Sequence, residues 1–192
     1  TLSAASKPEA KQVLVINGKV TVLPDAAETL RQYEALVVNG KATCPASLAA
    51  LFTEAATVNG KLVIYPDEAV VLSGRSVKLD RAFLLRAQER LYWNERLFVA
   101  VDPKLDAAAL AAKGCRFAAP KTVLAESLAE TLAPLFTEDT ELVILPDGTA
   151  VVDDDLDLTA AALRRYGTKL YVLGDVTVSA DCIAALGKLE FF

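Results

Sequence analysis

Apolar and polar residues alternate along the chain in short runs, which are separated by Asn-Gly and Pro-Asp pairs. Residues 13–22 alternate with a period of two around Asn17-Gly18, which predicts a β-strand. Pro24-Asp25 ends this run. Because Asp is a favoured residue at the first position of a helix, we expect Asp25 to cap a helix over residues 26–34.

The same succession of strands, turns and helices continues along the chain. We expect further strands at 35–38, 62–65, 69–72, 97–101, 116–119, 142–145, 150–152 and from residue 170. We expect further helices at 48–54, 79–90, 105–113, 124–136, 158–166 and 181–186. Residues 1–11 show no sustained period, so they are interpreted as a tail or lead-in before a single repeat domain at 12–192.

Stretches of the sequence recur at nearly regular spacing. Residues 14–25 return without a gap at residues 170–181, 156 positions later, which is twice 78. Residues 61–67 match residues 141–147 at an offset of 80. Self-similarity at a fixed period is typical of stacked repeats. The sequence therefore predicts about three periods of ~78 residues, the last incomplete, each built from units of ~20–28 residues.

Units of this length that combine a short strand with a helix resemble leucine-rich repeats. The chain resembles a leucine-rich-repeat-like α/β solenoid over nearly all of residues 12–192, by period and alternation. It departs from that family because no unit carries the asparagine-bearing signature L-x-x-L-x-L-x-x-N. A β-helix-like solenoid fits the same pattern, with its corners at Gly18, Gly40, Gly60 and Gly174.

The Asn-Gly pairs also support a different fold. Asn-Gly between alternating apolar residues is the strongest short signal for an antiparallel hairpin. The alternative is therefore a repeat of ββα units, with hairpin turns at Asn17-Gly18, Asn39-Gly40, Asn59-Gly60 and Asp147-Gly148. We favour the solenoid, because short repeating units need neighbours to bury their apolar faces.

Composition narrows the class of protein. The 192 residues are 53% hydrophobic and 23% charged, as in a globular domain, and no apolar run reaches the ~20 residues of a membrane helix. A net charge of −5 without a basic stripe disfavours nucleic acid and anionic membranes as partners. The chain has no Met and starts at Thr1, so it is expected to be a processed chain or a fragment.

The cysteines Cys44, Cys115 and Cys182 are scattered and form no CxxC pair. They predict buried free thiols in a reducing compartment, which favours a soluble cytoplasmic protein without a zinc site.

Little in the sequence points to catalysis. The chain has no His, the commonest general base and metal ligand, and residues 71–76 fail the pattern of a phosphate-binding loop. Asp153-Asp154-Asp155 with Asp157 is the densest charged run, but it lacks the spacing of a calcium loop. We interpret it as a solvated loop ahead of a helix, and we expect no metal or cofactor.

Aromatic residues supply the candidate interaction surface. Tyr92 and Trp93 form a concentration in the middle of the chain, and Phe191 and Phe192 end it. Exposed aromatic side chains suit a protein partner, although for Tyr92 and Trp93 we favour the interpretation as core residues. The terminal pair suggests an edge that further chain or another subunit covers.

These observations favour a non-enzymatic repeat module that binds an unknown protein partner or serves as a scaffold. One alternative is a structural solenoid that assembles into homo-oligomers through open repeat edges. A carboxylate-based, carbohydrate-active enzyme is the less favoured alternative, and it would require two facing acidic side chains in a groove.

Overall fold

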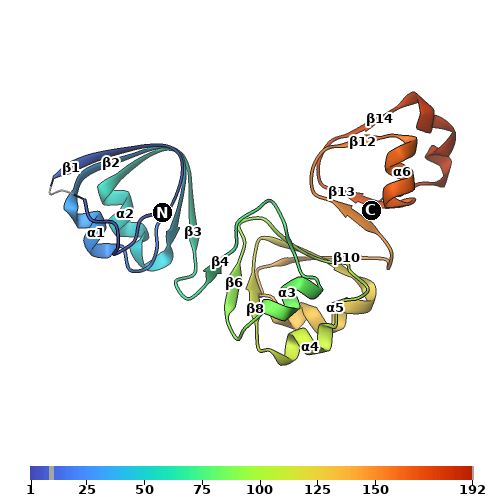
Figure 1. The fold of residues 1–192 in the computed structure, drawn as a ribbon, viewed down its shortest axis with the longest axis horizontal. Coiled ribbons are helices and arrows are strands. Elements are labelled where there is room, and N and C mark those ends of the chain that lie inside the picture. Colours follow the sequence, from blue (N-terminus) through green and yellow to red (C-terminus); the bar gives the residue numbers. More distant parts are fainter. Residues whose placement is uncertain (9–10, 192) are drawn as a thin grey trace. The chain divides into compact units, whose positions relative to one another are not determined.

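The computed structural model describes residues 1–8 and 11–191, and it gives the backbone alone for residues 184–185 and 190–191. The chain divides into two compact units, Thr1–Ala69 and Val70–Phe192. Both units are drawn in Figure 1.

The first unit consists of three long strands with short helices between them. Its elements are β1 (Gln12–Thr21), α1 (Ala27–Gln32), β2 (Tyr33–Pro45), the 3-10 helix η1 (Ala46–Leu48), α2 (Ala49–Ala55) and β3 (Ala56–Tyr65). The strands lie in the order β1-β2-β3 and pair in parallel. They arch over α1 and α2 (Figure 1).

The Asn-Gly pairs do not form hairpins. Asn17-Gly18, Asn39-Gly40 and Asn59-Gly60 lie inside β1, β2 and β3 and stand opposite one another in register. Asp147-Gly148 lies in a turn between strands that do not pair with each other. The alternative of antiparallel ββα units is therefore wrong, because every strand pair in the described residues is parallel.

Glycine is required at the point where these strands bend. Gly18, Gly40 and Gly60 have φ angles of 132°, 145° and 154°, a region that L side chains rarely adopt. A Cβ at Gly40 would lie 2.1 Å from the Gly18 carbonyl oxygen, and one at Gly60 would lie 2.0 Å from the Gly40 oxygen. At Gly18, on the edge strand, a Cβ would meet nothing within 4 Å. Stacking of successive strands thus excludes any side chain at positions 40 and 60.

Inward side chains of the three strands form the core of the first unit with both helices. Val38 of β2, Leu30 of α1 and Phe52 of α2 are fully buried. Leu2, near the start of the chain, belongs to the same cluster. The Tyr65 hydroxyl donates a hydrogen bond of 2.6 Å to the Val22 carbonyl oxygen, which ties the end of β3 to the turn after β1.

The second unit contains many shorter strands. Its elements are β4 (Val70–Val71), β5 (Val77–Lys78), α3 (Arg81–Arg86), β6 (Leu91–Trp93), β7 (Leu97–Ala100), α4 (Ala107–Ala112), β8 (Arg116–Ala118), β9 (Lys121–Ala125), α5 (Glu126–Leu132), η2 (Ala133–Leu135), β10 (Glu141–Leu145), β11 (Ala150–Val152), β12 (Leu156–Leu158), α6 (Ala160–Tyr166), β13 (Lys169–Val172), β14 (Val176–Val178), η3 (Ala180–Lys188) and β15 (Glu190–Phe191). They form the open sheets β4-β6-β8, β5-β7-β9-β10, β11-β13-β15 and β12-β14.

The chain is therefore a mixed α/β protein of short strands in small parallel sheets, none of them closed. Paired strands come from neighbouring stretches of the sequence. Leu36 lies opposite Ala56, 20 residues later, and Leu91 lies opposite Arg116, 25 residues later. No helix in the described residues is long and apolar enough to span a membrane.

Several predicted helix boundaries are wrong. The helix expected at 79–90 is only α3, which starts after the N-cap Asp80 and spans Arg81–Arg86. The helix expected from residue 124 starts at Glu126, because Lys121–Ala125 pairs with neighbouring strands as β9. Asp25 does not cap α1: the N-cap residue is Ala26, and no side chain caps this helix. The segment expected as a helix at 181–186 lies within the 3-10 helix η3.

Candidate functional site

The outward face of β1, β2 and β3 carries identical residues in rows. We call it the ladder face and define it by the asparagine row Asn17, Asn39 and Asn59 and the lysine row Lys19, Lys41 and Lys61. The Asn39 amide donates to the Asn17 side-chain oxygen at 2.8 Å, and the Asn59 amide donates to that of Asn39 at 2.9 Å. These hydrogen bonds fix the amide groups of the row in one orientation.

The lysine row concentrates positive charge on the ladder face. In-register parallel strands place equivalent side chains ~4.8 Å apart. Partial burial, and then the charges of Lys19 and Lys61, lower the pKa of Lys41. Three neighbouring ammonium groups complement acidic groups by charge. The row is therefore suited to carboxylates, while the amide row offers hydrogen bonds to a polar chain.

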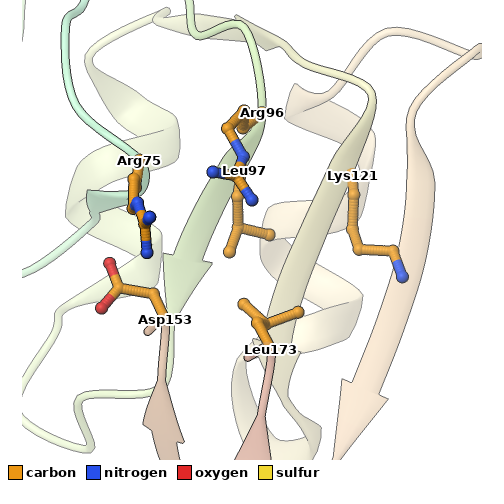
Figure 2. Close-up of a pocket in the computed structure, with 6 residues that line it drawn as sticks. All are labelled: Arg75, Arg96, Leu97, Lys121, Asp153 and Leu173. Carbon is orange, nitrogen blue, oxygen red and sulfur yellow. The ribbon is translucent and has the colours of Figure 1, made fainter. Parts of the chain in front are cut away.

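A small charged pocket lies in the second unit. Its volume is about 120 Å³, and it is lined by Arg75, Arg96, Leu97, Lys121, Asp153 and Leu173. In Figure 2, the Arg75 side chain extends toward Asp153, whereas the Lys121 ammonium group points away from that pair.

Three of the charged residues that line this pocket, Arg75, Lys121 and Asp153, contact neighbouring side chains. Arg75 forms an ion pair with Asp154, and the Ser76 hydroxyl donates to Asp153. Lys121 Nζ lies 3.0 Å from Glu141 Oε1, and this interaction is the main reason that the pKa of Lys121 is raised. Arg75, Lys121 and Asp153 of this pocket are thus each engaged by a neighbouring side chain.

The acidic run contributes to this network. Asp153 and Asp154 contact residues 77 and 79 positions earlier, and Asp155 Oδ1 accepts a hydrogen bond from the Asp175 backbone N–H at 2.9 Å. The run lies in a loop in which Asp154 and Asp155 are exposed, as expected, and its side chains also connect distant segments of the second unit. No group of three metal-ligating side chains occurs in the described part of the chain.

The predicted interaction residues are not brought together as a surface. Tyr92 and Trp93 are each 8% exposed. The Tyr92 ring packs edge-on against Phe83, at 5.2 Å between centroids, and stacks on Phe117 at 6.0 Å. Phe191 lies in β15 and is described only as backbone, which pairs with Leu170 of β13. Phe192 lies outside the described residues.

A buried asparagine was missed at the sequence level. The Asn94 amide donates to the carbonyl oxygens of Leu72 at 2.9 Å and Gly74 at 3.3 Å. Its side-chain oxygen accepts from the backbone N–H groups of Arg96 at 2.9 Å and Leu97 at 2.8 Å. Asn94 thereby satisfies the backbone at the corner after β6. In the sequence, the position of Asn94 directly after an apolar strand could have indicated that it satisfies the backbone at a turn.

A Ser–Asp contact that occurs once within each unit was also missed. Ser47 donates from its backbone N–H and its hydroxyl to Asp67 Oδ1, at 3.0 and 2.7 Å. Ser127 makes the same pair of bonds to Asp147 Oδ1, at 3.1 and 2.9 Å. Each Asp belongs to a Pro-Asp pair 20 residues after the serine, and this recurring offset was the signal.

The prediction of free, buried cysteines is confirmed. Cys44, Cys115 and Cys182 are all unbridged and buried. Burial, and then the nearby charge of Asp67, raises the pKa of the Cys44 thiol to about 11. A thiol with so high a pKa is protonated at neutral pH and is a poor nucleophile.

Comparison of the chain with protein-family models, curated proteins and solved structures found no match.

Proposed function

We propose that the protein is a non-enzymatic solenoid module that binds a protein partner through the ladder face and serves as a scaffold. The observation that carries this proposal is the in-register asparagine and lysine rows across β1, β2 and β3. Rows of identical groups at regular spacing suit an extended segment that crosses several strands, since each strand offers it the same contact.

The charge of the ladder face indicates the kind of segment that it binds. The chain carries a net charge of −5, yet three lysines stand side by side on this face. Complementary charge selects partners and speeds association. We therefore expect the partner to present an acidic segment, and we expect its affinity to fall as the salt concentration rises.

Charge reversal of the central lysine tests this function. The variant Lys41→Glu is compared with the wild type and with Lys104→Glu, which makes the same charge change at an exposed position of the second unit. Circular dichroism first checks that all three are folded. Each protein is then used to capture binding proteins, which are quantified by mass spectrometry and confirmed with the purified partner by calorimetry.

We expect a partner that the wild type and Lys104→Glu bind alike and that Lys41→Glu binds at least tenfold more weakly. Capture of the same proteins to the same extent by all three would contradict binding through the ladder face.

A further inference from the structure

One edge of the first unit is open along most of its length. β1 pairs with β2 on one side only. On its other side, Leu2 lies beside Val22: the Leu2 N–H donates to the Thr21 carbonyl oxygen, and the Leu23 N–H donates to the Leu2 oxygen, both at 2.8 Å. Residues 12–20 have no strand at this edge within the described part of the chain.

The core of the first unit is incomplete at the same edge. Leu14 and Ile16 of β1 are half-buried, whereas their register partners Leu36 and Val38 in β2 are 2% and 0% exposed. Val15, on the outward side of the edge strand, is 55% exposed. A further strand beside β1 would bury Leu14 and Ile16 as β1 itself helps to bury Leu36 and Val38.

The side-chain and backbone pattern of β1 is that of a strand with one neighbour missing. In both existing contacts of the asparagine row, the later strand donates its amide to the side-chain oxygen of the earlier strand. An earlier strand beside β1 would accept from the Asn17 amide by the same geometry. There is room for its backbone, because a Cβ at Gly18 meets nothing within 4 Å, while the equivalent Cβ at Gly40 collides with the strand before it.

We infer that the outer edge of β1 is a docking site for an extended segment of a partner protein, which adds as a parallel strand. The segment carries alternating apolar residues opposite Leu14 and Ile16, followed by Asn-Gly opposite Asn17 and Gly18. An unpaired strand edge supplies backbone hydrogen bonds for such addition, and alternate side chains give it specificity. The inferred interface continues the β1–β2 and β2–β3 contacts of the same sheet.

Charge selects the residue that follows Asn-Gly in this segment. It stands opposite Lys19, at the end of the lysine row. Like charges directly opposite each other on paired strands are destabilising, and opposite charges are favourable. The docking segment therefore carries Glu or Asp at this position. A second copy of the chain is disfavoured, because its β3 would place Lys61 beside Lys19 and lengthen the row of like charges.

This inference rests on the proposed role as an interaction module, but it concerns a different surface. The probe is a fluorescent peptide that copies residues 34–43 of the chain, with Glu in place of the lysine at position 41. A second peptide keeps that lysine. Binding of both to the full chain is measured by fluorescence anisotropy. We expect saturable binding of the Glu peptide, at least fivefold tighter than that of the Lys peptide.

Two protein variants test the geometry. In Gly18→Ala, the new Cβ would lie about 2 Å from a carbonyl oxygen of the docked strand, by analogy with Gly40, and binding should weaken at least tenfold. The matched control is Gly148→Ala, also at a positive φ, where a Cβ meets nothing within 4 Å and binding should be unchanged. The variant Lys19→Glu should reverse the preference, so that the Lys peptide binds more tightly. This reversal tests the site even if Gly18→Ala is unstable.

Three outcomes would overturn the inference: no binding of the Glu peptide, equal binding by Gly18→Ala and the wild type, or an unchanged peptide preference in Lys19→Glu.

Light scattering across a range of protein concentrations provides a fourth test of the inference. If the protein alone associates and the peptide does not dissociate it, the edge belongs to a second copy. The variant Lys41→Glu separates the two proposals. If it still binds the Glu peptide but no longer binds the protein partner, both surfaces are supported. If it loses the peptide but keeps the protein partner, the result counts against docking at the edge of β1.

Discussion

Replacement of glycine by alanine at two equivalent positions of the first unit separates backbone strain from a steric collision. Gly18 and Gly40 have similar φ angles, 132° and 145°, so either substitution forces a side chain into a disfavoured backbone region. That strain costs ~1–3 kcal/mol per residue. Only at Gly40 does the new Cβ also collide, at 2.1 Å from the Gly18 carbonyl oxygen.

The collision sets the size of the difference. Real Cβ atoms essentially never approach another atom closer than 3.0 Å, so at 2.1 Å the two strands must separate locally by about 0.9 Å. Ladder hydrogen bonds of ~2.9 Å would stretch beyond their normal range. Loss of two or three such bonds, at ~0.5–1.5 kcal/mol each, makes Gly40→Ala about 1–4.5 kcal/mol more destabilising than Gly18→Ala.

Urea unfolding followed by hydrogen exchange and mass spectrometry measures this difference. Peptides from residues 33–65 report the first unit directly, whereas the only tryptophan, Trp93, lies in the second unit. We expect the midpoint for these peptides to fall much further in Gly40→Ala. Equal losses in the two variants would refute the stacking of glycines across β1 and β2.

Three further predictions concern single side chains. Asn94→Ala removes four hydrogen bonds from a buried corner and should destabilise the second unit by ~2–4 kcal/mol. Unfolding of this unit is measured by the fluorescence of Trp93, and a loss of stability below ~1 kcal/mol would contradict the role of Asn94. Hydrogen bonds from Ser47 lower the pKa of Asp67 below its ordinary value of 3.8, so this carboxylate stabilises the fold above that pH, and its contribution is lost as the pH falls through the lowered pKa. The stability of wild type relative to Asp67→Asn should therefore decline as the solution is acidified below pH 3.8, and a difference independent of pH would contradict this role of Asp67. The Cys44 thiol, with a pKa of about 11, should react with a thiol reagent at pH 8 far more slowly in the folded protein than in urea, as absorbance would show; equal rates would contradict its burial.

Local sequence patterns located many helices and strands correctly. They failed where contacts with distant residues determine the secondary structure. The sequence predicted a strand around Asn17-Gly18, which corresponds to β1. It also predicted helices at residues 48–54, 105–113 and 158–166, which correspond to α2, α4 and α6 respectively. It assigned residues 79–90 to one helix, but only Arg81–Arg86 is helical, since helix propensity alone does not report the neighbouring strands. The Ser–Asp contacts could have been expected from the recurring offset of 20 residues.

The candidate surfaces were less accessible to such reasoning. An Asn-Gly pair has the same local preferences whether it joins two antiparallel strands or bends one strand, so the ladder face could not be distinguished from a set of hairpins. Exposure of Tyr92 and Trp93 could not be read from their sequence, because burial depends on what packs against them.

The sequence by itself determined the succession of short strands and helices, the glycines at the bends and the three free cysteines, because these follow from residue type and spacing. Only the tertiary structure decided that the strands pair in parallel and that Asn17, Asn39 and Asn59 form a continuous row. It also revealed that Asp153 and Asp154 contact Ser76 and Arg75. The physical reason is that all of these contacts join residues about 20 or nearly 80 positions apart, and which groups meet at such separations depends on how the strands pair and pack within each unit.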